Sequence, residues 1–261
     1  MTYEQVNFKK PIETEEYREC SDYVIKHIEQ IIDDAIKAGQ NKIVINTNLR
    51  LGLPMENINK IAGPFVEAWA FETFSIVMEN PDNKYQLINV QAQERLSKAD
   101  VILQFRKQRK VEMGVTAEVD VKATAQDIEN SGKSPNITSY AVIRTAYVLE
   151  PDLIFVILSL KHKVYSTKNA ETGLMDGIME VVDYKAYDIK YLGNSDISYN
   201  PALGTGQIQI RDIHYVDIEY RTAWEFCQLL DKKYLASSRR NFDEWVILAN
   251  RNKWIKTDDL F

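Results

Sequence analysis

The chain has 261 residues, 45% of them hydrophobic, which is enough to bury a substantial core in one large domain or two small ones. Its formal net charge of −6 argues against binding nucleic acid by bulk electrostatic attraction, although basic residues gather between positions 232 and 256. The first residues lack the apolar core of a signal peptide, and no run of about 18 apolar residues is present to span a membrane. The two cysteines, Cys20 and Cys227, lie far apart, so we expect a cytoplasmic protein with free thiols.

Helix and strand signals alternate along the chain. An apolar stripe predicts a helix from Tyr17 to about Gly39, and a second helix is expected over 63–79, with Pro64 in its first turn. Extended segments are expected at 41–48, 85–90, 100–106, 111–124 and 153–160, and further helices at 138–148, 221–236 and 241–253. No repeat, low-complexity linker or break in composition interrupts this pattern. We therefore predict a single mixed α/β domain over residues 1–261.

The segment 117–124, AEVDVKAT, carries a chemical signal. Valines alternate with Asp120 and Lys122, and side chains two apart in a strand lie on one face, about 6.5 to 7 Å apart. A solvated outer face is the plain interpretation. Asp100 favours another, because it opens the preceding strand, where an antiparallel partner would bring it beside Asp120. Two converging carboxylates favour Mg²⁺, and a lysine beside that ion can position water, as phosphodiester hydrolysis requires.

Glu67 is a further candidate. It lies in the predicted helix 63–79, whose apolar residues would pack on the sheet, so its carboxylate could reach the metal or its waters. An exposed helical glutamate is an equally simple interpretation on spacing alone, and Glu72 is a weaker competitor.

The carboxylate at position 100, the EVDVKA strand and the upstream helical glutamate resemble the PD-(D/E)XK nuclease motif, with Ala99 where the family signature has proline. Three longer stretches, at 45–70, 120–148 and 174–216, resemble the HpaI family of Type II restriction endonucleases, and the DVK and PNI segments resemble the HincII endonuclease more distantly. The resemblance implies a restriction-endonuclease-like α/β fold, with a mixed β-sheet flanked by helices. It also implies a bacterial homodimer that uses Mg²⁺ and no nucleotide cofactor, does not bind membranes, and cuts a palindromic duplex. For the HpaI type the site is GTTAAC, cut centrally to blunt ends with 5′-phosphates.

The same resemblance implies roles for single residues. It assigns metal binding to the carboxylates of Asp100 and Asp120 and to the backbone carbonyl of Val121. Lys122 then lies next to the attacking water, and Glu67 matches the helical acid of the fold. The long interval between the two aspartates suggests that 106–114 form a hairpin excursion rather than a tight turn.

A polar loop follows the catalytic strand. An enzyme that cuts at one sequence must read base edges, and a loop leaving this strand is well placed to enter a groove. Asn136 is the best candidate, because its amide can donate to and accept from adenine in the major groove, which is worth about 1 to 3 kcal/mol of discrimination. Four neighbours are candidates for phosphate or base contacts: Ser131, Gly132, Lys133 and Ser134. The alternative is an ordinary solvated loop.

A second reading element is expected in the segment 197–213, where small and amide residues form a turn that leads into a strand. The candidates for base-edge or minor-groove contacts are Asn200, Thr205, Gln207 and Gln209. A plain turn is the equal alternative.

Two-fold symmetry of the site favours a two-fold dimer, and the apolar stripe of the N-terminal helix either joins its interface or covers its own sheet. Two other function classes are open. A structure-selective junction or repair nuclease of the same fold would cut branched or damaged DNA, but the resemblance along nearly the whole chain speaks against it. A non-catalytic DNA-binding protein would leave DNA intact, and the set of Asp100, Asp120 and Lys122 speaks against that class.

Overall fold

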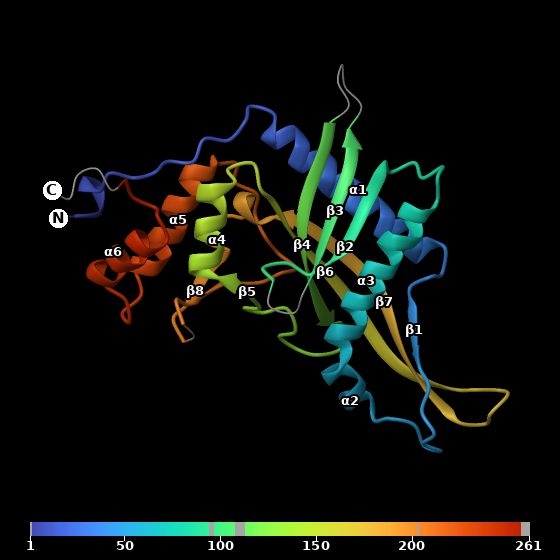
Figure 1. Cartoon of the computed structure of the whole chain (residues 1–261). Helices are drawn as coiled ribbons and strands as arrows, with labels where there is room; N and C mark the ends of the chain where they lie inside the picture. Colours follow the sequence, from blue (N-terminus) through green and yellow to red (C-terminus); the bar gives the residue numbers. More distant parts are fainter. Residues whose placement is uncertain (1, 94–96, 108–112, 203, 257–261) are drawn as a thin grey trace. The chain divides into compact units, whose positions relative to one another are not determined.

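The computed structural model describes residues 2–93, 97–107, 113–202 and 204–256, which group into two compact units (Figure 1). The larger unit comprises Cys20–Gly132 and Phe155–Tyr187, and the smaller unit comprises Met1–Glu19, Lys133–Ile154 and Asp188–Phe261. The chain passes from one unit to the other repeatedly, so neither unit is a continuous segment and no linker marks a boundary in the sequence. A single restriction endonuclease domain over 1–261 stays a prediction.

A curled β-sheet is the framework of the larger unit (Figure 1). Within the described residues, six strands pair in the order β1–β7–β6–β4–β3–β2. Their bounds are Lys42–Ile45 (β1), Leu87–Ala92 (β2), Val101–Lys107 (β3), Met113–Ala125 (β4), Ile154–Lys168 (β6) and Met175–Asp188 (β7). The pairs β1–β7, β2–β3 and β3–β4 are antiparallel. This sheet, with the helices that flank it, confirms the predicted restriction-endonuclease-like α/β fold.

Apolar and polar residues alternate along β3 and β4, as predicted. Buried side chains recur at every second position: Val101, Leu103 and Phe105 on β3, and Val115, Ala117, Val119 and Val121 on β4. A slip of one residue would turn this row away from the core, so burial sets the register, in which Val101 faces Val119. The two strands form the expected hairpin, although residues 108–112 of the predicted excursion over 106–114 lie outside the described residues.

The first helix, α1 (Tyr17–Lys37), confirms the predicted apolar stripe. The stripe lies in the core of the chain itself, where four of its residues are buried: Val24, Ile28, Ile31 and Ile32. Of the two predicted roles, a dimer interface or a cover for the chain's own sheet, this burial favours the second. The chain leaves the helix at Gly39, whose φ of +74° suits a residue without a side chain. The participation of this segment in a dimer interface stays a prediction.

Two further helices lie in the larger unit, α2 (Met55–Lys60) and α3 (Ala62–Glu79). Pro64 occupies the first turn of α3, where its missing N–H costs no helical hydrogen bond. Val66, Ala70 and Phe74 are buried, and α3 contacts β2 and β4. The helix that carries Glu67 therefore packs on the strand that carries Asp120.

The smaller unit contains a three-stranded antiparallel sheet in the order β5–β9–β8, formed by Asn136–Ser139 (β5), Ile197–Asn200 (β8) and Gln207–Ile210 (β9). Its helices are α4 (Tyr140–Leu149), α5 (Ala223–Leu235) and α6 (Phe242–Arg251), with 3-10 turns at Tyr3–Gln5 and Ile189–Tyr191. The helix expected over 138–148 begins two residues late, because Thr138 and Ser139 pair in β5. In the described part of the chain, no helix combines the length and apolarity needed to cross a membrane.

A buried carboxylate joins α4, α5 and α6. Asp231 accepts hydrogen bonds from Arg144 Nε at 3.1 Å, from the Tyr140 hydroxyl at 2.6 Å and from Trp245 Nε1 at 3.2 Å. The Tyr3 hydroxyl donates to its second oxygen at 2.7 Å. The side chains of Arg144 and Asp231 are both fully buried. Because Tyr140 directly follows β5, this network also fixes one end of the three-stranded sheet.

Candidate functional site

Asp120 and Lys122 lie side by side on β4, as predicted. Lys122 Nζ donates to Asp120 Oδ1 at 2.8 Å. The side chain of Asp120 is 6% exposed and that of Lys122 is 24% exposed. The interpretation of this strand face as solvated is therefore wrong for Asp120, because the sheet and its helices cover the carboxylate.

Asp100 comes to the same end of the strand pair. The register that pairs Val101 with Val119 continues by one residue to bring Asp100 opposite Asp120. The Asp100 backbone N–H donates to the Val119 carbonyl at 3.0 Å, and its Oδ2 accepts from the Val121 N–H at 2.7 Å. The backbone of β4 thus orients the Asp100 carboxylate toward this strand.

The acids of this site oppose one another electrostatically. Burial raises the pKa of Asp120 to about 7, Asp100 and Glu67 add to the rise, and the Lys122 ammonium works against it. The pKa of Glu67 is also raised, first by burial and then by Asp100, with Lys122 again opposing. Glu67, the least specific of the four predictions, therefore lies in the field of the other three groups.

A hollow of about 570 Å³ opens beside these residues. It is lined by Glu67, Ala68 and Phe71 from α3 and by Ala92, Gln93, Asp100 and Val101 from the strand side. Glu67 and Asp100 thus face one space, and Glu67 is half-buried, so the interpretation of it as an exposed helical glutamate does not hold.

The predicted metal ligands suit a hard divalent cation. Asp120 Oδ2 is buried without a hydrogen-bond partner, so this oxygen lacks the compensation that a bound cation would supply. In the described residues, no three His, Cys, Asp or Glu side chains form a metal-binding group by themselves. The donor set would therefore consist of the two aspartates with a backbone carbonyl and waters, which is the pattern typical of Mg²⁺.

An ion pair next to this site was missed from the sequence. Lys98 Nζ lies 2.8 Å from Glu118 Oε1, and Glu118 Oε2 is buried without a partner. Glu118 precedes Asp120 by two residues and so shares its strand face. A second hollow of about 230 Å³, lined in part by Gln93, Lys98 and Glu118, lies here. The alternation of Glu118, Asp120 and Lys122 was the available signal.

The candidate base-reading residues of the smaller unit come together on its sheet. Asn136 on β5 lies opposite Gln209 on β9, and Gln209 lies opposite Ser198 on β8. Ser139, Gln207 and Asn200 form a second such row. Two predicted segments that are far apart in the sequence therefore share one polar sheet face.

Two of these candidates also support the turn between β8 and β9. Asn200 Oδ1 accepts from the Ala202 N–H at 3.0 Å. Thr205 Oγ1 lies 2.8 Å from Ser139 Oγ, and the Thr205 carbonyl accepts from the Tyr199 hydroxyl at 2.8 Å. Asn200 and Thr205 thus stabilise the turn, which is the structural role that the alternative interpretation of this segment assigned to them.

The polar loop is ordered by its own contacts. Ser131 Oγ accepts from the Ala125 N–H at 2.7 Å, and Gly132 has a φ of +89°. In the smaller unit, the Lys133 ammonium pairs with Asp212, and Ser134, with a φ of +47°, donates its N–H to the Arg211 carbonyl at 3.0 Å. The role of these four residues toward DNA stays a prediction.

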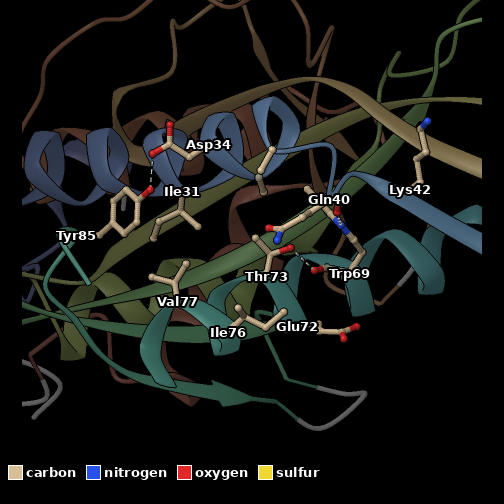
Figure 2. A pocket seen from close by; sticks show the side chains of 12 residues that line it. Ile31, Asp34, Gln40, Lys42, Trp69, Glu72, Thr73, Ile76, Val77 and Tyr85 are labelled. Atoms are coloured by element: carbon tan, nitrogen blue, oxygen red, sulfur yellow. Dashed lines mark hydrogen bonds between the residues drawn. The ribbon is translucent and has the colours of Figure 1, made fainter. Parts of the chain in front are cut away.

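Another hollow, of about 450 Å³, lies between α1 and α3 (Figure 2). Several of its polar groups have partners within the chain: the Tyr85 hydroxyl donates to Asp34 at 2.5 Å, and Trp69 Nε1 donates to the Gln40 carbonyl at 2.8 Å. Lys84 also pairs with Asp34. Glu72, the weaker competitor of Glu67, lines this hollow and not the one that Glu67 and Asp100 share.

Comparison with known proteins agrees with this geometry. A family model described as Type II restriction endonuclease HpaI matches residues 4–253. The Type II restriction enzyme HpaI of Haemophilus parainfluenzae is 57% identical to this chain over 256 residues, which cover 98% of this chain and 100% of that protein.

Proposed function

The chain belongs to the HpaI family of Type II restriction endonucleases, and we propose that it cuts both strands of the palindrome GTTAAC at its centre, leaving blunt ends with 5′-phosphates. Family membership makes it a site-specific hydrolase of double-stranded DNA. The observation that carries the chemistry is the buried Asp120, held by Lys122 on one oxygen and without a partner on the other.

Type II restriction enzymes generally use divalent metal ions, and we infer Mg²⁺ for this chain. Asp100 and Asp120 would hold it through their carboxylates and Val121 through its backbone carbonyl, with Glu67 within reach of its waters. When bound, the ion supplies charge neutralisation at phosphorus and activates water for attack. The raised pKa values of Asp120 and Glu67 support this assignment, because a cation would offset both burial and mutual repulsion.

Lys122 supplies the remaining charge. Its Nζ, anchored on Asp120 Oδ1, is placed to hold the attacking water and to put a positive charge beside the phosphate oxygens. The water oxygen forms a bond to phosphorus and loses one of its protons, the bond from phosphorus to the 3′ oxygen breaks, and the 3′ oxygen takes up a proton. The products are a 5′-phosphate and a 3′-hydroxyl.

We assign base reading to the polar face of the three-stranded sheet, with Asn136, Gln207 and Gln209 as its exposed or half-exposed amides. Asn200 and Thr205 shape the adjoining turn, and the loop from Ser131 to Ser134 precedes β5 and supplies further contacts to phosphate or bases. A palindrome repeats each half-site by two-fold symmetry, so we propose a homodimer that places one active site on each strand.

The test is digestion of a large sequenced plasmid or phage DNA by the purified protein, with Mg²⁺ or with EDTA, followed by sequencing of the fragment ends. The matched variant is Asp120→Ala, which removes both the Lys122 anchor and the buried free oxygen. Size-exclusion chromatography with light scattering, with and without a duplex carrying the site, measures the oligomeric state.

We expect discrete fragments that depend on Mg²⁺, end bluntly at GTT/AAC and are absent with the variant. Cleavage at another palindrome would overturn the site and leave the reaction class intact. A smear, preferential cutting of branched substrates, or DNA binding without cleavage would overturn the restriction activity itself.

A further inference from the structure

We propose that Asn136 and Gln209, here called the reading pair, act as one unit that reads a single adenine. This inference rests on the proposed function, since it says how one base of the site is recognised. The two residues lie opposite each other on β5 and β9. Gln209 Nε2 donates to Asn136 Oδ1 at 2.9 Å and to the Ser134 backbone carbonyl at 3.0 Å.

The Ser134 carbonyl decides which way both amides point. A carbonyl oxygen only accepts hydrogen bonds, so the Gln209 amide must turn its nitrogen toward Ser134. The same nitrogen faces the Asn136 side chain, which must then present its oxygen, because two amide nitrogens cannot bond to each other. Ser134 is itself fixed, since its N–H donates to the Arg211 carbonyl. Neither amide of the reading pair can therefore flip without losing a hydrogen bond.

This arrangement leaves one acceptor and one donor on the surface. Among the described residues, Gln209 Oε1 and the Asn136 Nδ2 group have no partner, and Asn136 is exposed while Gln209 is half-exposed. Adenine presents an acceptor, N7, beside a donor, the N6 amino group, in the major groove. Asn136 Nδ2 complements N7, and Gln209 Oε1 complements N6. Guanine presents two acceptors, N7 and O6, so Gln209 Oε1 would meet an oxygen and the pair would reject guanine.

The reading pair divides one recognition task between two strands. An isolated amide reading adenine must fix its own rotamer on binding, which costs side-chain entropy. Here the cross-strand hydrogen bond and the Ser134 carbonyl hold the donor and the acceptor in place before DNA arrives. The two residues should therefore contribute to discrimination together and not separately.

The test uses the full-length wild-type protein and a duplex with one cleavage site, in which each adenine is replaced in turn. The first analogue, 7-deazaadenine, lacks the N7 acceptor, and the second, purine, lacks the N6 amino group. We expect one adenine per half-site at which each analogue lowers kcat/KM by about 10- to 100-fold, the range of a good bidentate base contact. Sensitivity to N7 and N6 at different adenines, or at none, overturns the proposal.

Variants then test the coupling. Gln209→Glu keeps an acceptor but cannot donate to Ser134 or Asn136, so it should lose discrimination at the same adenine as Asn136→Ala. The double variant should be no worse than the poorer single variant. The contrast is Gln207→Glu, the same change on the same strand opposite Ser139, whose effect should multiply with that of Asn136→Ala.

The readouts separate failure of this inference from failure of the proposed function. If the wild-type protein cuts no duplex under any metal condition, the restriction activity fails. If it cuts normally and the effects of Gln209→Glu and Asn136→Ala multiply independently, only the reading pair fails. Circular dichroism and Tm confirm that each variant is folded, and the analogue series on wild-type protein needs no variant.

Discussion

Replacing Asp120 with asparagine is expected to abolish cleavage and to stabilise the metal-free protein. The Asp120 side chain is 6% exposed, and one of its carboxylate oxygens has no partner. Among the described residues, the ion pair with Lys122 supplies the only hydrogen bond to this carboxylate. Asparagine has nearly the same shape and no charge. The variant thus removes a group that the proposed reaction needs and that destabilises the folded state when charged.

Two effects compete in this variant, and their sizes decide the sign. The ion pair with Lys122 favours the carboxylate, while burial opposes it; the net result is a pKa raised from 3.8 to about 7. At about 1.4 kcal/mol per pKa unit, the charged form costs the folded state on the order of 4 kcal/mol at pH 8. The side-chain amide N–H of the new asparagine would be buried without an acceptor, which costs about 1 to 3 kcal/mol and offsets part of the gain from removing the charge. We expect a net gain of about 1 to 3 kcal/mol, or about 2 to 12 °C in Tm.

The assay is thermal unfolding in EDTA at pH 8 and pH 5.5. The folded-state pKa of Asp120 lies above its unfolded value, so the cost is complete above pH 7 and shrinks as pH falls toward 4. The advantage of Asp120→Asn should therefore be smaller at pH 5.5. Glu129→Gln neutralises an exposed acid and should stay within about 0.5 kcal/mol of wild type. Adding Mg²⁺ should raise the Tm of the wild type more than that of the variant. A variant Tm at or below wild type at pH 8, or retained cleavage, refutes the reasoning.

Three further outcomes follow from the same structure. Gly206→Ala should weaken DNA binding and lower the Tm, because Gly206 has a φ of +89° and an added Cβ would lie 2.2 Å from the Tyr199 ring; normal binding by gel shift would contradict this. Asp231→Ala should cost about 3 to 5 kcal/mol in denaturant unfolding, since it leaves the Arg144 charge buried and unpaired, and a loss below about 1 kcal/mol would show that the network is dispensable. Burial lowers the pKa of His162, so stability should fall as pH drops below about 6.5, and His162→Gln should flatten the profile between pH 5 and 7; an unchanged profile would assign the acid sensitivity elsewhere.

The sequence predicted those parts of the fold that depend on local pattern. Alternation of valines with Asp120 and Lys122 defined β4, and the apolar stripe defined α1, because each periodicity reports which face is buried. The pattern also placed Asp120 and Lys122 on one face, which the ion pair between them confirms. The pattern could not predict that Asp120 is buried, because the sequence of a strand does not indicate whether a helix covers its polar face.

Long-range pairing lay beyond sequence patterns. Asn136 and Gln209 are 73 residues apart, and nothing in either segment specifies that β9 pairs with β5. Asp231 shows the same limit, because an acid within an amphipathic helix is usually exposed and its four partner side chains come from distant segments. Lys98 and Glu118 were missed for a different reason: Glu118 belongs to the alternating pattern of β4, but no pattern in the sequence indicates that Lys98 pairs with it.

The two proposed sites, the polar face of the three-stranded sheet and the group around Asp120, would meet opposite electrostatic requirements. The chain is acidic overall, with a net charge of −6, and the two cross-strand rows that contain Asn136, Ser139, Ser198, Asn200, Gln207 and Gln209 carry no charge. If this face reads DNA as proposed, its neutral amides and hydroxyls would release few counterions on binding, add little affinity for random duplex, and direct their hydrogen bonds to base edges. Affinity for the correct site then depends on complementarity, which a mismatch removes at about 1 to 3 kcal/mol per base pair. In the proposed reaction, positive charge beside phosphorus would come from Lys122 and a divalent ion, and would act on the bond to be broken.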